Sequence, residues 1–287
     1  MKLWRALPFI GDSGPLVTVI ELGGVIGAAG PGRKGLSLQR LEKSIEAAFK
    51  PGRLSAVALA INSPGGSPVQ SRLIFSMIRR LAQEKAVPVL AFIEDVGASG
   101  GYILAIAGDE IYADESSIVG SIGVIASGFG FQHAIEKLGV ERRVHTAGKS
   151  KSTLDPFKPE DPEDVARLKN ILNDMHTQFI ELVQSRRTDK LAADEEIFSG
   201  AFWTAPRAKA LGLIDGTAQL GDFLRARYGK DVKIKRISPD SGGLLKKLLS
   251  GGAQSNVGEP GIGQPLIDAD AILDAVERRS VWARFGL

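Results

Sequence analysis

Hydrophobic positions along the chain fall into two kinds of run. Residues 16–27, 56–63 and 87–95 are almost continuously apolar, which is typical of strands buried in a sheet that is covered on both faces. Residues 37–50 and 69–84 lie between these runs and place their apolar side chains at the spacing of amphipathic helices. The order strand, helix, strand, helix predicts an α/β fold with mainly parallel strands.

The rest of the chain continues with shorter elements and one long helix. An apolar run up to Ala107 predicts a helix, and residues 109–126 predict two short strands joined by a turn. Residues 159–187 predict a long helix, because acidic residues at its start and arginines at its end complement the helix dipole. Residues 199–216 predict a short extended piece, a helix and a return strand.

Composition divides the chain into three parts. Residues 1–14 form an N-terminal segment, and residues 15–225 hold the predicted sheet and its helices. Residues 226–287 are basic and rich in Gly, Ser and Pro, which indicates a flexible linker followed by a C-terminal helix at 268–279. The apolar and cationic stretch 242–252 could touch anionic lipid or pack on a neighbouring subunit.

Composition also excludes some kinds of chemistry. The 36 basic and 33 acidic residues leave a net charge of +3, which is too balanced to indicate a nucleic-acid partner. The absence of cysteine excludes disulfides, thiolate catalysis and Cys-ligated metals. The three histidines show no metal-ligand spacing, so we expect neither a metal nor a cofactor.

The first ten residues look like a weak signal peptide, but Arg5 and Pro8 break their apolar run. No stretch reaches the roughly 20 uninterrupted apolar residues that span a bilayer. We therefore expect no transmembrane anchor and no signal peptide. The predicted location is cytoplasmic or peripheral at a membrane.

The glycine-rich stretch Gly97–Gly101 contains a candidate nucleophile. It follows an apolar strand that is expected to end at Glu94, and a helix is expected after it. A serine in this position can lie at the helix N-terminus beside free backbone N–H groups, where an oxyanion hole can form. Ser99 is therefore a candidate nucleophile, and a serine that caps the helix is the alternative.

A second glycine turn, in Asn62–Gly66, ends another apolar strand. Gly65 and Gly66 permit positive φ angles and close approach of the backbone, so their amides could point at a bound carbonyl oxygen. An ordinary tight turn is the alternative interpretation of this motif.

A serine nucleophile needs a base, because its hydroxyl is hardly ionised near neutral pH. His133 and His145 follow Ser99 in the chain, but no acidic partner stands out near either, and we interpret both as surface or partly buried side chains. Lys149 and Lys151 lie in a polar, turn-prone stretch and offer another base. A lysine can serve only where burial lowers its pKa, so the site must be closed and partly apolar.

Five motifs taken together resemble the signal peptide peptidase A family, the S49 serine peptidases. They are Asn62–Gly66, Gly97–Tyr102, Val119–Ile125, Gly148–Phe157 and Ser199–Asp215. Their order and spacing are similar to those of the family across roughly residues 15–225, which the resemblance identifies as an S49-type peptidase domain. The resemblance implies a Clp-protease and crotonase-like spiral of ββα units.

The resemblance also implies a Ser-Lys dyad. The family serine falls on Ser99 and the family lysine on Lys151, with Lys149 in the same motif as the competitor. A family serine that hydrogen-bonds the lysine amine falls on Ser121.

The oxyanion hole implied by the family consists of the backbone N–H groups of Gly66 and Gly100. Members assemble into ring or dome oligomers in which neighbouring subunits or repeats supply serine and lysine. The chain holds one such catalytic repeat, so we expect a homo-oligomer in which the dyad forms between chains and assembly buries the lysine. Many members also carry an N-terminal membrane anchor, and none is expected in this sequence.

The implied activity is that of a serine endopeptidase acting on unstructured or apolar peptides similar to signal-peptide remnants. Crotonase-type acyl-CoA chemistry is an alternative on the same fold, with Glu94 and Asp95 as acid and base, but the lysine motif disfavours it. An inactive scaffold or assembly protein is a further alternative. The intact Ser99, Lys151 and Ser121 argue against it.

Overall fold

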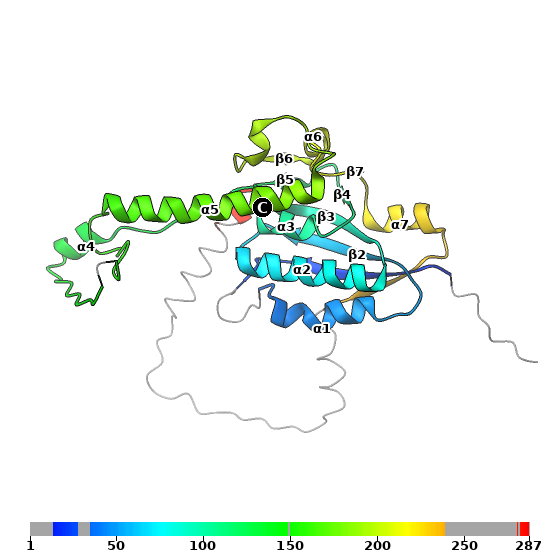
Figure 1. Ribbon diagram of the computed structural model, residues 1–287, viewed down its shortest axis with the longest axis horizontal. Coiled ribbons are helices and arrows are strands. Elements are labelled where there is room, and N and C mark those ends of the chain that lie inside the picture. Colours follow the sequence, from blue (N-terminus) through cyan, green and yellow to red (C-terminus); the bar gives the residue numbers. More distant parts are fainter. Residues whose placement is uncertain (1–13, 28–34, 149, 239–279, 281, 287) are drawn as a thin grey trace, which may run out of the picture.

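The computed structural model shows a body built around one sheet, from which an arm projects (Figure 1). The described residues are 14–27, 35–148, 150–238, 280 and 282–286. Several predicted features lie outside them: the N-terminal segment up to residue 13, Lys149, the stretch 242–252 and the helix at 268–279. Contact of the stretch 242–252 with lipid therefore stays a prediction.

Four parallel strands form the main part of the sheet. They are β1 (Leu16–Gly23), β2 (Leu54–Ser63), β3 (Val89–Ala98) and β8 (Lys233–Ile237), in the order β3-β2-β1-β8. The predicted α/β class with mainly parallel pairing is confirmed. Because β8 pairs with β1, the sheet continues beyond residue 225, where the sequence placed the end of the domain.

The far edge of β3 is shared by two strands that lie end to end. The shorter strands are β4 (Glu110–Ala113), β5 (Ile118–Gly120), β6 (Phe202–Thr204) and β7 (Gly216–Thr217). Leu90–Ile93 of β3 pair with β4, Val96–Ala98 pair with β5, and β6 then pairs antiparallel with β5. The prediction that this strand ends at Glu94 is wrong, because β5 gives its second half a hydrogen-bonding partner as far as Ala98.

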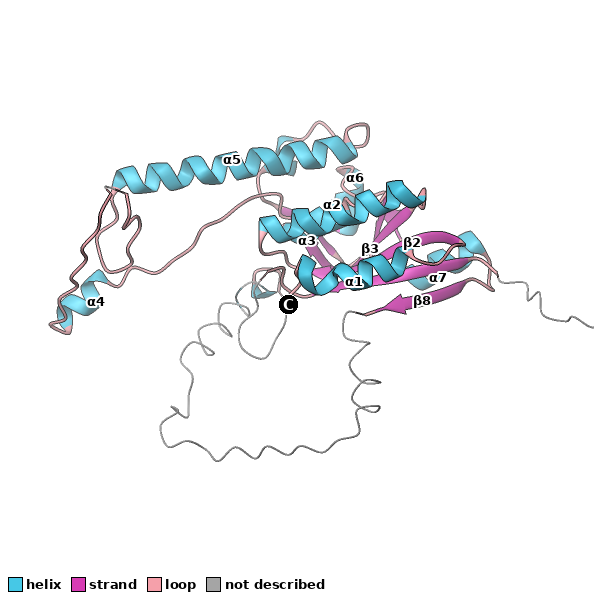
Figure 2. Cartoon of the chain, turned by 60° about the horizontal axis from the view of Figure 1, so that its bottom comes forward, coloured by secondary structure: helices cyan, strands magenta, loops and turns pink. Residues whose placement is uncertain are grey.

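Helices cover both faces of the sheet, with more of them on one face than on the other. They are α1 (Leu38–Phe49), α2 (Pro68–Lys85), α3 (Gly100–Ala105), α4 (Gln132–Lys137), α5 (Pro162–Arg187), α6 (Ala205–Ala210) and α7 (Leu220–Tyr228), with a 3-10 turn at Glu195–Phe198. The views in Figures 1 and 2 agree that α1, α2 and α3 lie on one face and α7 on the other. None of the described helices is long and apolar enough to cross a membrane.

Alternation along β2 explains why this strand is apolar throughout. Val57, Leu59 and Ile61 belong to the large core beneath α1, α2 and α3, whereas the alanines at positions 56, 58 and 60 face the smaller core beneath α7. Successive strand residues point to opposite faces, so a strand covered on both faces needs apolar residues at every position.

The end of α5 is held to the body by a buried ion pair. Arg187 is 3% exposed and donates to Asp215 at 2.8 Å and to the Gly212 carbonyl at 2.7 and 3.0 Å. Asp215 also accepts from Lys190 at 2.6 Å and from the Ile111 amide at 2.7 Å. The network joins α5 to β4 and to the segment after α6, and it therefore fixes where α5 crosses the body.

We expect Asp215→Asn to lower the free energy of unfolding by about 3 kcal/mol, because it leaves a buried guanidinium without its counter-charge. Burial alone would raise the pKa of Asp215, but hydrogen bonds from Arg187 and Lys190 hold it below its usual range. The stabilisation is therefore complete above the unfolded pKa of about 3.9 and is lost as pH falls through the lower folded pKa.

Urea unfolding at neutral and acidic pH measures this effect. Glu84→Gln is the matched control, since Glu84 pairs with Arg80 on the surface of α2, and it should cost less than about 0.5 kcal/mol. Equal stability of the two variants would contradict a structural role for the buried pair.

Candidate active site

Ser99 is the single residue between β3 and α3, and its backbone is strained. Its φ of 52° and ψ of −123° are rare for a residue with a Cβ, and such a conformation costs about 1–3 kcal/mol. The Ser99 amide donates to the Gly120 carbonyl at 2.8 Å, and its carbonyl accepts from the Tyr102 amide at 2.9 Å. The hydroxyl makes no capping hydrogen bond among the described residues, so it does not cap α3.

The loop that follows β2 lies directly against this turn. A Cβ placed on Gly65 would come within 2.8 Å of the Gly100 nitrogen and within 2.8 Å of the Ser99 Cβ. Gly65 and Gly66 also have φ angles of 102° and 140°. Glycine is therefore required here both by the close approach and by the backbone conformation.

Two backbone amides beside Ser99 are free to bind an anionic oxygen. Among the described residues, neither the Gly66 N–H nor the Gly100 N–H donates a hydrogen bond, and both residues line the same cavity as Ser99. Gly100 opens α3, where the first N–H groups of a helix have no partner within the helix. Such a pair of donors near a nucleophile is the arrangement that stabilises a tetrahedral oxyanion.

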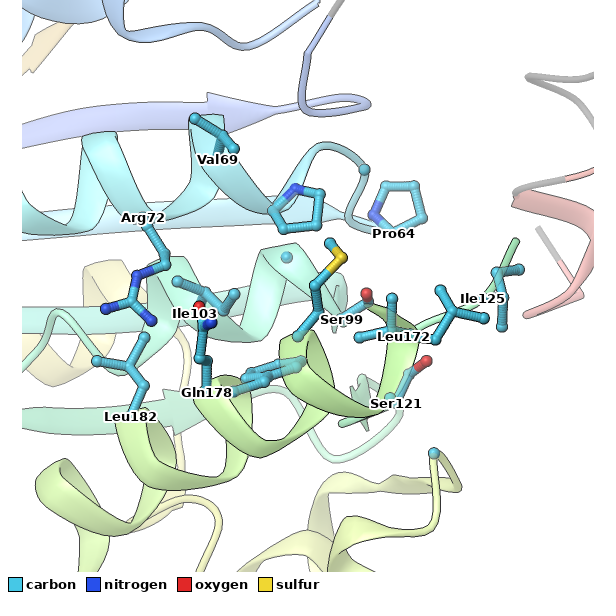
Figure 3. A pocket seen from close by; sticks show the side chains of 18 of the residues that line it. Pro64, Val69, Arg72, Ser99, Ile103, Ser121, Ile125, Leu172, Gln178 and Leu182 are labelled. Atoms are coloured by element: carbon cyan, nitrogen blue, oxygen red, sulfur yellow. The ribbon is translucent and has the colours of Figure 1, made fainter. Parts of the chain in front are cut away.

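Ser121 lies on the same cavity, directly after β5. It is 6% exposed, has a φ of 53°, and its amide donates to the Ala201 carbonyl at 2.7 Å. Figure 3 shows Ser99 and Ser121 on the wall of one pocket. The turn after β5 thus brings a second hydroxyl group to the site.

Backbone strain is concentrated in three of the sequence motifs. The described non-glycine residues with positive φ are Ala86, Ser99, Ser121 and Leu154. Ala86 ends α2 in a left-handed cap, which is an ordinary structural use. The other three lie at the serine turn, at the turn after β5 and in the loop that carries Lys151, and strained residues of this kind cluster at functional sites.

The cavity beside Ser99 has a volume of about 750 Å³ and is mainly apolar. The residues that line it include Val69 of α2, Ile103 of α3 and Leu172 of α5 (Figure 3). Met175 and Phe179 of α5 line it as well. The sequence shows the helical spacing of the α5 residues, but it does not show that α5 lies over Ser99. These wall residues were therefore missed by sequence reasoning.

Lys151 does not join this cavity within one chain. It is exposed and lies in the arm, which comprises residues 126–148 and 150–164 and projects beyond the body (Figures 1 and 2). Its loop is attached to the start of α5, where the Leu154 amide donates to Asp164 at 3.4 Å. Asp164 precedes Leu172, which lines the cavity, by eight helical residues, or about 12 Å along α5.

The lysine loop has a defined shape within the arm. Asp155 accepts from Arg142 at 3.0 Å and from the Phe157 amide at 3.1 Å, and the Phe131 amide donates to the Pro156 carbonyl at 2.6 Å. The hydrogen bond from the Phe157 amide, together with Arg142, holds the pKa of Asp155 below its usual range. Lys151 therefore lies four residues before a hydrogen-bonded segment of the arm.

The other candidate bases and acids lie away from Ser99. His133 and His145 are exposed, as interpreted from the sequence, and neither lines the cavity. Glu94 and Asp95 line a separate cavity of about 540 Å³, and no described Asp or Glu lines the cavity of Ser99. The carboxylates that crotonase-type chemistry would use are thus absent from this wall. Within the described ranges, no three His, Cys, Asp or Glu side chains could hold a metal ion.

The strand order and the divided edge of β3 define the class of fold, which is the Clp-protease and crotonase-like α/β fold. A mutant of the 1510-N membrane-bound stomatin-specific protease, solved with a substrate peptide, is a structural neighbour with a TM-score of 0.51 and 16% identity. The match covers 83% of this chain and 97% of that one.

Sequence comparison then identifies the family. The family model of peptidase family S49 matches residues 81–233, more than half of the chain, and the chain belongs to this family. It is 50% identical over 273 residues to a Brucella abortus protein named Na(+)/H(+) antiporter NhaA, and 30% identical over 279 residues to the chloroplastic serine protease SPPA of Arabidopsis thaliana. These matches cover 94% and 92% of this chain, which spans 37% and 40% of the length of the two relatives.

Proposed function

We propose that this chain is a serine endopeptidase that hydrolyses unstructured, mostly apolar peptides of the kind that signal peptides leave behind. One observation carries the proposal: Ser99 is held in a strained strand-to-helix turn and faces an apolar cavity, beside two amides that bond to no other described residue. Membership of peptidase family S49 supports a peptide bond as the bond that is cleaved.

In the proposed mechanism, the Ser99 Oγ attacks the carbonyl carbon of the scissile peptide bond. Its proton passes to the neutral amine of Lys151, and the N–H groups of Gly66 and Gly100 bind the oxyanion that forms. The protonated amine then donates to the leaving nitrogen as the peptide bond breaks. Water attacks the resulting ester in the same way and frees Ser99. Ser121 hydrogen-bonds the lysine amine and directs it towards Ser99.

A second copy of the chain supplies the lysine in this proposal. A lysine amine accepts a proton only when it is neutral, and burial away from water favours the neutral form. Lys151 is exposed on the single chain, and its arm also exposes large apolar side chains at Phe129, Leu138 and Val140. Exposed apolar side chains that gather on a projecting element mark an interaction surface. Docking of the arm on a neighbouring body would cover both these side chains and the lysine.

We expect a fluorophosphonate probe to label the folded protein at Ser99, since such probes react with serine hydroxyls that a base has activated. Mass mapping of the labelled peptides locates the modified residue. Protein unfolded in urea before labelling is the control and should stay unmodified, because unfolding separates Ser99 from the Gly66 donor and from the base, and releases the turn that holds the Gly100 amide in place. Labelling at other serines alone, or none in the folded protein, would contradict the proposed nucleophile.

A further inference from the structure

The cavity beside Ser99 carries charge of one sign only. Its charged lining residues are Arg72 and Arg284, and none of the described acidic residues lines it. The remaining walls are mostly apolar, with Gln178 and a few serines as neutral polar groups. An apolar cavity with cationic groups and no carboxylate is complementary to an apolar ligand that also bears negative charge.

Arg72 differs from the other arginines of α2 in having no acidic partner in the described part of the chain. Arg79 pairs with Asp109 at 2.7 Å, and Arg80 pairs with Glu84 at 2.9 Å. No described carboxylate lies within ion-pair distance of Arg72. Its side chain instead lines the cavity, as do Gln178 and Leu182 of α5, and in Figure 3 it lies on the opposite side of the view from Ser121. The guanidinium therefore keeps its donors available for a ligand.

The position of Arg72 places it within reach of a substrate bound at Ser99. Helix α2 begins at Pro68, directly after the loop that holds Gly66, and the Ser67 hydroxyl accepts from the Gln70 amide at this start. Arg72 lies four positions after Pro68, which is about 6 Å along the helix axis. An extended peptide advances about 3.3 Å per residue, so this rise corresponds to about two residues of a peptide bound along α2.

We propose that Arg72 is a specificity-determining residue that binds a carboxylate of the substrate. The preferred substrates are then apolar peptides with a negative charge within three residues of the scissile bond, rather than uniformly apolar ones. The carboxylate comes either from an Asp or Glu side chain or from the free C-terminus of a short peptide. This inference rests on the proposed function, because it assigns the substrate class of that same site.

A peptide series tests the inference. One apolar sequence is amidated at its C-terminus, and Glu or Gln is placed in turn at each of the three positions on either side of the cleaved bond. We expect the best position to favour Glu over Gln by about tenfold in kcat/KM, as one charge-assisted hydrogen bond at a partly open site would give. A second series compares the free acid with the amide of the Gln peptide and identifies a C-terminal carboxylate as the source.

The same ratios are then measured in variants. Arg72→Gln should bring the Glu to Gln ratio to about one, and Arg72→Lys should restore part of it, since lysine keeps the charge without the guanidinium fork. Arg80→Gln is the matched control on the same helix and should leave the ratio unchanged. An Arg72→Gln variant that keeps the preference for a carboxylate, or a wild type that shows none in either series, would overturn the inference.

The design separates this inference from the proposed function. If peptides are cleaved with equal rates for Glu and Gln and for acid and amide, only the inference fails. If no peptide is cleaved, the proposed function fails, and fluorescence anisotropy of labelled peptides bound to the wild-type protein still measures the preference. Tighter binding of the carboxylate peptides that disappears in Arg72→Gln supports the inference, and equal binding contradicts it.

Discussion

Ser99→Ala is expected to abolish peptide hydrolysis, with kcat falling by about a thousandfold or more. The substitution removes the nucleophile, so only the oxyanion donors and the cavity remain to act on the substrate. The assay is hydrolysis of a fluorogenic apolar peptide by purified protein. Ala keeps the Cβ, so the strained backbone at this position is expected to be the same as with Ser and the fold to remain intact.

Ser76→Ala is the matched control for this variant. Ser76 lies exposed on α2 and does not line the cavity, so its loss should leave the rate within about twofold of wild type. Unfolding curves of the three proteins should superimpose. Substantial cleavage by folded Ser99→Ala would show that another group attacks the substrate, and the proposed mechanism would then fail.

Mixed oligomers test where the lysine comes from. Ser99→Ala and Lys151→Ala are each expected to be inactive alone, but co-expression should recover about a quarter of the wild-type rate. In random mixtures, about one site in four pairs an intact Ser99 from one chain with an intact Lys151 from its neighbour. The physical reason is that the lysine loop is attached at Asp164, which lies about 12 Å along α5 from Leu172 in the cavity wall, so the arm carries Lys151 away from the cavity of its own chain.

The mixed oligomers distinguish a dyad formed between two chains from a dyad formed within one chain. If each chain completed its own dyad, every site in the mixture would lack one of the two groups and activity would stay absent. Lys149→Ala is the matched control from the same loop and should remain active by itself. If Lys149→Ala loses activity and Lys151→Ala keeps it, Lys149 is the base and Lys151 is not.

The pattern of apolar residues was sufficient for the fold class because each signal is local. A strand such as β2 must be apolar on both faces when helices cover both faces of the sheet, and its neighbouring helix must repeat its apolar residues at helical spacing. The same pattern did not predict the residue at which β3 ends. Its last residues are held by β5, a strand some twenty residues later in the chain, and pairing at that distance leaves no local pattern.

For the site, the sequence alone determined which residue types could act: a serine among glycines, a glycine pair after a strand, and a lysine in a polar loop. Only the tertiary structure decided how they meet. It placed Ser99, Ser121 and the free amides of Gly66 and Gly100 on one cavity, and it left Lys151 on a projecting arm. It also brought Arg72 and the apolar face of α5 to the same cavity, because packing over the sheet is a long-range contact that helical spacing does not encode.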